Sequence, residues 1–259
     1  MPLLEIENVN KDFGGLEALR EVSMQVKTGE IVSLIGPNGA GKTTLFNCIN
    51  GTMPPTSGHI ALENESLVNL SPHEVAARGV ARTFQHVRLF NQMTVLDNVM
   101  VGNDYRGHTG IFSALVRPPW VAREERENRE KSIAILSLFG ERLLPRLDQQ
   151  ASMLSYANRR RLEIARALVS DPKLLLLDEP TAGMNPHETQ GLVDLIRIIR
   201  DRGHSILVIE HKMKVVMTVS DRIVVLDHGE KIAEGTPDMI SQNPSVINAY
   251  MGKRRAETH

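Results

Sequence analysis

The segment Gly36-Pro37-Asn38-Gly39-Ala40-Gly41-Lys42-Thr43-Thr44 directly follows a short apolar run at residues 31–35. The apolar run predicts a buried strand, and the three glycines let the backbone take positive φ and turn its N–H groups inward around a polyphosphate. A strand, this nine-residue pattern and a following helix are together typical of a phosphate-binding loop. The alternative is a glycine-rich turn that binds no nucleotide, and it does not account for the complete pattern.

The last residues of this loop predict its chemistry. Lys42 supplies a point charge for the β and γ phosphates, and Thr43 offers a hydroxyl group to Mg²⁺. The helix that we expect to begin near Lys42 directs the positive end of its dipole at the same anion. We therefore predict that residues 36–44 bind a nucleoside triphosphate together with Mg²⁺.

Composition narrows the class of protein. Of the 259 residues, 41% are hydrophobic and 24% are charged, as is usual for a folded globular chain. A nucleotide-binding unit of this size forms one domain with at most a subdomain, so we expect residues 1–259 to be a single domain. Lys and Arg total 30 against 31 Asp and Glu. With no net positive field and no basic helix with interleaved aromatic residues, nucleic acid is not an expected partner.

Cysteine usage and hydropathy bear on the compartment. Cys48 is the only cysteine, so no internal disulfide can form, and we expect it to be a small core residue. No stretch approaches the roughly 18 apolar residues that a membrane helix needs, and no signal region opens the sequence. We expect a cytoplasmic protein that serves a membrane only through other subunits.

The periodicity of apolar residues predicts the fold class. Short strands are expected at residues 3–9, 18–26 and 58–62, which suggests an antiparallel layer at the N-terminus. The pattern at about 87–160 is helical, with Thr94 as the N-cap of a helix that runs through Tyr105, and we expect an inserted helical subdomain. Apolar strands that alternate with helices then follow at residues 174–178, 206–210 and 223–226. This alternation predicts an α/β fold with a mainly parallel core sheet.

Two adjacent carboxylates end the predicted strand at residues 174–178. Asp178 and Glu179 point in different directions because side chains alternate along a strand, so they can serve different tasks. Asp178 is placed to hold Mg²⁺, and Glu179 to polarise the water that attacks the γ-phosphate. Two acids at a strand end are usually solvated turn residues, but the phosphate-binding loop earlier in the chain favours the functional interpretation.

Two further polar residues follow apolar strand-like segments. His211 stands where a parallel sheet presents residues over a nucleotide and can sense the γ-phosphate; the alternative is a structural histidine. Gln85 lies where the helical block begins, and its amide can ligate Mg²⁺ or water; the alternative is a solvated loop glutamine. Ser155 is a natural N-cap of an amphipathic helix, and a helix N-terminus can bind an anion. In isolation it is an ordinary capped helix.

In this order along the chain, the motifs resemble those of the ATP-binding subunits of ABC transporters, and the resemblance covers essentially the whole sequence. It implies a head-to-tail dimer, with ATP on one P-loop closed over by the signature segment of the other subunit. It also implies that Phe13 stacks on adenine, for which a core phenylalanine is the alternative. The signature departs from Leu-Ser-Gly-Gly-Gln, because it reads Leu154-Ser155-Tyr156-Ala157-Asn158. Ser155 and the N–H of Ala157 are expected to bind nucleotide, whereas the Ala157 methyl group is expected to hinder closure.

In finer detail the chain resembles the LivG-type ATPases of branched-chain amino-acid importers. The residues that carry this likeness lie at 13–16, 82–90, 107–120, 209–213 and 235–250. The resemblance implies as partners a second, LivF-like ATPase or a second copy of the chain, two membrane permeases and a periplasmic or extracellular solute-binding protein. It implies a peripheral location at the cytoplasmic face of the inner membrane.

Several alternatives to this function stay open. Urea, amides or another amino acid can replace the branched-chain amino acids as cargo. A weakly hydrolysing regulatory subunit is favoured by Ala157 and Asn158 and opposed by Lys42, Glu179 and His211. A soluble ABC ATPase of translation or DNA repair is disfavoured, because the sequence contains neither a second ABC unit nor a long coiled-coil insertion.

Overall fold

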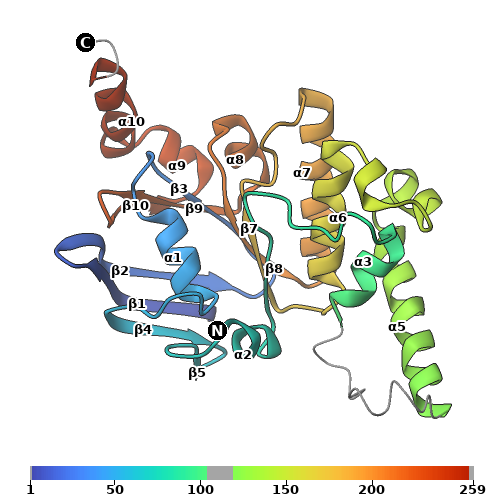
Figure 1. Cartoon of the computed structure of the whole chain (residues 1–259). Helices are drawn as coiled ribbons and strands as arrows, with labels where there is room; N and C mark the ends of the chain where they lie inside the picture. Colours follow the sequence, from blue (N-terminus) through green and yellow to red (C-terminus); the bar gives the residue numbers. More distant parts are fainter. Residues whose placement is uncertain (1, 104–118, 257–259) are drawn as a thin grey trace.

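The computed structural model describes residues 2–103 and 119–256, so most of the predicted connection at 107–120 lies outside the described residues. The first layer is a four-stranded antiparallel sheet in the order β2-β1-β4-β5. Its strands are β1 (Pro2–Phe13), β2 (Leu16–Lys27), β4 (Ser57–Leu62) and β5 (Glu65–Ser66). The predicted N-terminal antiparallel layer is confirmed, with longer strands than the sequence indicated (Figure 1).

The second layer is a six-stranded sheet in the order β10-β9-β3-β8-β7-β6. Its strands are β3 (Ile31–Ile35), β6 (Val80–Arg82), β7 (Leu174–Asp178), β8 (Ser205–Ile209), β9 (Arg222–Asp227) and β10 (Glu230–Gly235). All its pairs are parallel except the hairpin of β9 with β10. The expected α/β fold with a mainly parallel core sheet is confirmed.

The central strands β3, β7, β8 and β9 are buried on both faces, because alternate residues of each strand enter different cores. Leu174 and Leu176 of β7 join the cluster that contains α1 (Lys42–Ile49) and the antiparallel sheet. Leu175 and Leu177 join the cluster on the opposite face. A strand that is apolar at nearly every position is typical of such two-sided burial. The helix that follows the P-loop is therefore fixed between the two sheets.

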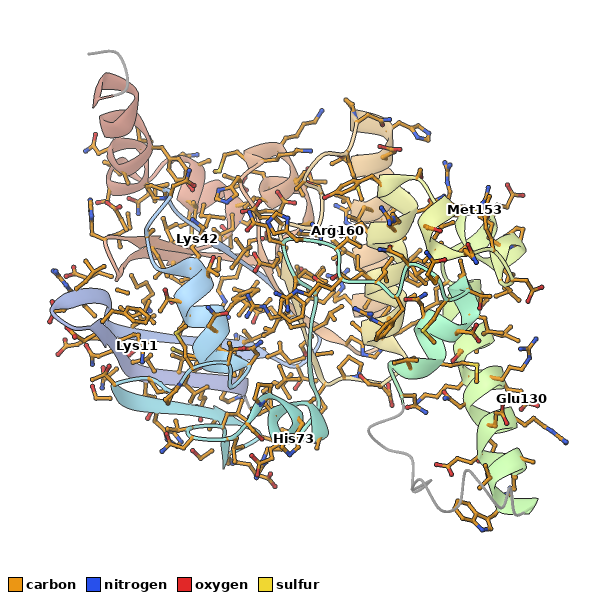
Figure 2. All side chains as sticks on the ribbon, viewed as in Figure 1. Lys11, Lys42, His73, Glu130, Met153 and Arg160 are labelled. Atoms are coloured by element: carbon orange, nitrogen blue, oxygen red, sulfur yellow. The ribbon has the colours of Figure 1, made fainter. Side chains whose placement is uncertain are left out.

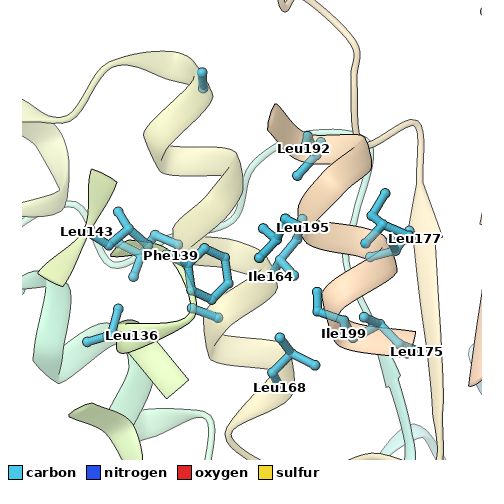
Figure 3. Packing of buried hydrophobic residues seen from close by; sticks show 14 of the residues in the cluster. Leu136, Phe139, Leu143, Ile164, Leu168, Leu175, Leu177, Leu192, Leu195 and Ile199 are labelled. Carbon is cyan, nitrogen blue, oxygen red and sulfur yellow. The ribbon is translucent and has the colours of Figure 1, made fainter. Parts of the chain in front are cut away.

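Helices cover the opposite face. They are α3 (Val95–Val101), α5 (Pro119–Ser137), α6 (Tyr156–Leu168), α7 (Pro186–Asp201) and α8 (Met213–Val219). Figure 3 shows side chains of α5, α6, α7 and β7 meeting in one core, among them Leu136, Ile164 and Leu195. In Figure 1, α3, α5 and α6 lie together at the right of the molecule, away from the antiparallel sheet.

Several short elements complete the chain. They are α2 (Pro72–Ala77), α9 (Pro237–Ser241), α10 (Pro244–Ala256) and the 3₁₀ helices η2 (Gly140–Arg142), η3 (Leu144–Arg146) and η4 (Ala151–Met153). Thr94 caps α3 as predicted, accepting from the Asp97 N–H, but α3 ends at Val101 and residues 102 and 103 form a turn. The predicted helix through Tyr105 is therefore too long. Gly102 allows α3 to approach α6 closely, because a Cβ there would lie 2.2 Å from the Arg166 carbonyl oxygen. None of the helices in the described part of the chain has the length and apolar character of a membrane span.

Candidate active site

The P-loop joins β3 to α1 and is packed tightly against its neighbours. Gly36, Gly39 and Gly41 all have positive φ, at 150°, 82° and 98°. A Cβ on Gly36 would lie 2.0 Å from the Leu226 carbonyl oxygen, and one on Gly41 would lie 2.6 Å from that of Ala18. Glycine is thus required at these two positions by close packing as well as by backbone conformation.

Lys42 lies at the start of α1, inside the loop. Its side chain is buried, and Nζ donates hydrogen bonds to the carbonyl oxygens of Gly36 at 2.7 Å and Pro37 at 2.9 Å. The N-cap residue, Gly41, provides no side-chain cap. A helix N-terminus that follows a glycine-rich loop can bind an anion, and Thr43, which is exposed, lies in the first turn of α1.

Asp178, at the end of β7, is held by an arginine that the sequence analysis did not single out. Arg82 Nη2 donates to Asp178 Oδ2 at 2.9 Å, and Nη1 donates to Asn47 Oδ1 of α1 at 2.6 Å. The side chains of Arg82 and Asp178 are only 7% and 5% exposed. The pair links β6 and β7 to the helix that follows the P-loop. In the sequence, Arg82 could have been noticed as a single charged residue in a short apolar strand, directly before Thr83-Phe84-Gln85.

The side chain of Glu179 contacts two other predicted site residues. Its Oε1 lies 2.7 Å from His211 Nε2, and its Oε2 accepts a hydrogen bond from Gln85 Nε2 at 3.4 Å. The backbone of Glu179 has φ of 47°, an unusual conformation for a non-glycine residue, and its N–H donates to the Ile209 carbonyl. Such strain clusters at functional sites, where the surrounding structure supports it. The structure therefore brings the carboxylate, the imidazole and the amide into direct contact.

The signature segment lies on a different side of the sheet. Ser155 caps α6, with its Oγ accepting from the Asn158 N–H at 3.4 Å. α1 and α6 pack against opposite faces of the mixed sheet. Ala157 is buried in the core, so its methyl group packs inside this chain, which argues against the hindrance expected from the sequence.

Phe13 ends β1 and is 48% exposed, which excludes the alternative of a core phenylalanine. The ammonium group of Lys11 lies 5.2 Å from the centre of its ring. An exposed ring with this polar neighbour is available to stack on a planar ligand.

A second arginine missed by the sequence analysis is Arg160 of α6, which Figure 2 labels in the middle of the molecule between Lys42 and Met153. It is fully buried and forms an ion pair of 2.9 Å with Glu163, three residues further along the helix. The pair occupies the face of α6 that carries Ala157, Ile164 and Leu168. Two opposite charges spaced i, i+3 within the apolar stripe of a helix are the signal that was available.

The fold and the site define a P-loop ATPase of the ATP-binding-cassette class. A family profile described as "ABC transporter" matches residues 19–182, and one described as "Branched-chain amino acid ATP-binding cassette transporter" matches residues 230–256. The chain therefore belongs to the ABC transporter family, and it is the subunit that binds and hydrolyses ATP in such a transporter.

Relatives of known name are similar over nearly the full length. The chain is 48% identical to "High-affinity branched-chain amino acid transport ATP-binding protein LivG" of Salmonella typhimurium, across 97% of this chain and 98% of the relative. It is 44% identical to the BraF protein of Pseudomonas aeruginosa, of the same description, with the same coverage. A solved structure, the ADP conformation of MJ1267, an ATP-binding cassette of an ABC transporter, superposes with a TM-score of 0.85 at 33% identity, covering 97% of this chain and 99% of that one.

Proposed function

We propose that this chain binds Mg²⁺-ATP and hydrolyses it to drive the import of branched-chain amino acids through partner permeases at the cytoplasmic face of the membrane. The observation that carries the hydrolytic part is the contact of Glu179 with both His211 and Gln85. The cargo is supported by the names of relatives that are 44–48% identical.

The residues around Asp178 fit a magnesium ion. Asp178 presents a buried carboxylate whose Oδ2 is bound by Arg82, and we assign its other oxygen, with the Thr43 hydroxyl and the Gln85 amide, to the metal. One carboxylate with a hydroxyl, an amide and phosphate oxygens is the usual set for Mg²⁺ in nucleotide sites. The ion would neutralise negative charge on the phosphates.

Each remaining residue has a task in the proposed reaction. The N–H groups of residues 36–44 and the Lys42 ammonium bind the phosphates and stabilise the charge that develops during transfer. Glu179 accepts the proton of the attacking water, and His211, 2.7 Å from it, orients this carboxylate and the γ-phosphate. Phe13 stacks on the adenine. These residues form one half of a site.

The other half comes from a partner in this proposal. We assign Ser155 and the Ala157 N–H to the nucleotide of a second subunit, and the packing of α6 on the face of the sheet opposite to α1 supports this assignment. That subunit is a second ABC ATPase or another copy of this chain. Two permeases and a solute-binding protein complete the assembly.

The test uses the complex that co-purifies with the full-length chain. Glu179→Gln should abolish steady-state ATP hydrolysis while ATP binding persists, whereas Glu130→Gln, an exposed carboxylate on α5, should leave turnover unchanged. Leucine, isoleucine and valine on the binding protein should stimulate hydrolysis, and urea or amides should not. Normal turnover by the Glu179→Gln complex would refute the assignment of the base, and stimulation by urea or amides alone would refute the cargo.

A further inference from the structure

The segment Phe84–Arg88, which carries Gln85, is bound from one side by two charged residues of α6. Arg160 donates to the carbonyl oxygens of Phe84 and Gln85, the latter at 2.6 Å from Nη2. Glu163 Oε1 accepts from the N–H groups of Phe84 at 3.4 Å and Arg88 at 3.3 Å. The ion pair therefore satisfies donors and acceptors of the same loop at once.

Arg160 also reaches the loop that carries Glu179. Its Nη2 donates to the Glu179 carbonyl oxygen at 3.4 Å, while the Glu179 side chain accepts from Gln85 Nε2. One guanidinium thus binds the backbones of Gln85 and Glu179, the two residues whose side chains meet in the site. The planar fork of arginine can hold several carbonyl oxygens in fixed geometry, which a lysine ammonium cannot do over the same span.

The two side chains of the pair are buried, and this bears on their role. Arg160 is 0% exposed and Glu163 is 2% exposed, so water does not compete for either group. An ion pair in such surroundings contributes little net stability, because desolvation offsets the attraction. Its directional hydrogen bonds to one loop can instead fix the position of that loop. Removing Arg160 would break its bonds to the carbonyl oxygens of Phe84, Gln85 and Glu179 and leave Glu163 as a buried charge without its partner.

We propose that Arg160, together with Glu163, is a positioning residue that fixes Gln85 and Glu179 relative to α6, so that a movement of the signature end of α6 is transmitted to both. The catalytic part of this inference rests on the proposed roles of Gln85 and Glu179. The physical tie, by which we mean the bonds of Arg160 to the backbones of these two residues, does not depend on those roles. Neighbouring arginines bind elsewhere. Arg159 bonds Asn91 at 2.6 Å, and it therefore provides a matched control within the same helix.

Hydrogen exchange of the full-length chain tests the tie directly. Arg160→Lys keeps the buried positive charge but cannot reach both carbonyl oxygens, and it should speed amide exchange in residues 84–88 by roughly 10- to 100-fold. Arg159→Met should leave this segment unchanged, and residues 42–49 of α1 should be unchanged in both variants. Equal exchange of residues 84–88 in Arg160→Lys and Arg159→Met would overturn the proposal.

Kinetics of the assembled complex give a second readout. Arg160→Lys should lower kcat by roughly 10- to 100-fold with KM for ATP changed less than about twofold, because the P-loop is untouched. Arg160→Met should lower kcat further; where it does not fold, Glu163→Gln, which keeps the shape of the side chain, replaces it with the same expected direction. A rise in KM equal to the fall in kcat would overturn the positioning role. Failure of Glu179→Gln to stop hydrolysis, with faster exchange in Arg160→Lys, would refute the proposed base and leave the tie intact.

Discussion

Replacing Arg82 with methionine should lower the free energy of unfolding by about 3–5 kcal/mol, because Asp178 is then left as a buried charge without its partner. The two side chains are 7% and 5% exposed, and their charged atoms lie 2.9 Å apart. At this distance two unit charges attract by about 6 kcal/mol at an effective dielectric constant of about 20. Methionine fills much of the same volume between Phe46 and Phe84, so the loss reports mainly on the charge.

Urea unfolding at pH 7 measures this loss, and thermal unfolding should show a Tm lower by roughly 6–20 °C for a chain of this size. The control is Arg20→Met. Arg20 also forms an ion pair, with Glu17 at 2.8 Å, but both side chains are at least half exposed. Exposed pairs are screened by water, so this variant should change stability by less than about 0.5 kcal/mol.

A double-mutant cycle separates the pair from its surroundings. Arg82→Met and Asp178→Asn together should cost about 2 kcal/mol less than the sum of the two single changes, because the second change removes the charge that the first one strands. A loss for Arg82→Met no larger than that for Arg20→Met would refute the reasoning. Additive losses in the cycle would refute it equally.

Three further outcomes follow from the packing and the pKa shifts. Gly36→Ala should weaken ATP binding at least about tenfold, as measured by nucleotide titration, and should lower the stability in urea unfolding more than Gly203→Ala does. Both glycines have positive φ, but of the two only Gly36 has an oxygen 2.0 Å from the position of an added Cβ. Burial raises the pKa of the Cys48 thiol to about 11, so a thiol reagent at pH 8 should modify it slowly in the folded chain and rapidly in urea; fast labelling when folded would contradict its burial. Burial alone raises the pKa of Glu30, but hydrogen bonds from Arg222 and a backbone N–H lower it below its ordinary value of 4.5. Wild type should therefore lose stability as the pH falls below about 4.5, and Glu30→Gln should flatten this loss in urea titrations at each pH.

The sequence was informative where a residue's task depends on its own strand or helix. The runs at 31–35 and 174–178 coincide with β3 and β7, because a strand buried on both faces is apolar at nearly every position. The caps Thr94 and Ser155 were also predictable, since capping is a local hydrogen bond. The three-residue strand β6 had no such pattern.

Contacts across the fold were not predictable in the same way. Arg160 stands among three consecutive arginines, which in a sequence are typical of a solvated surface, and only the packing of α6 against the loop after β6 buries it. From the sequence, the methyl group of Ala157 was expected to hinder closure of the signature segment over a nucleotide. The orientation of α6 instead buries this methyl group in the core. Position on a helix face relative to other elements decided both cases.

Arg82 and Arg160 connect the segment after β6 to two different helices. Arg82 lies directly before this segment in the chain. It binds Asp178 of β7 and Asn47 of α1, and so connects the start of the segment to the helix that follows the P-loop. Within the segment, Arg160 binds Phe84 and Gln85 and so holds it to α6. In the proposed dimer, the N-terminus of α1 binds the nucleotide of its own chain, and the N-terminus of α6 binds the nucleotide of the partner. A displacement of α6 by the partner's nucleotide therefore cannot occur without moving or breaking contacts to Gln85. Because Gln85 contacts Glu179, the occupancy of one site should change the geometry of the base in the other.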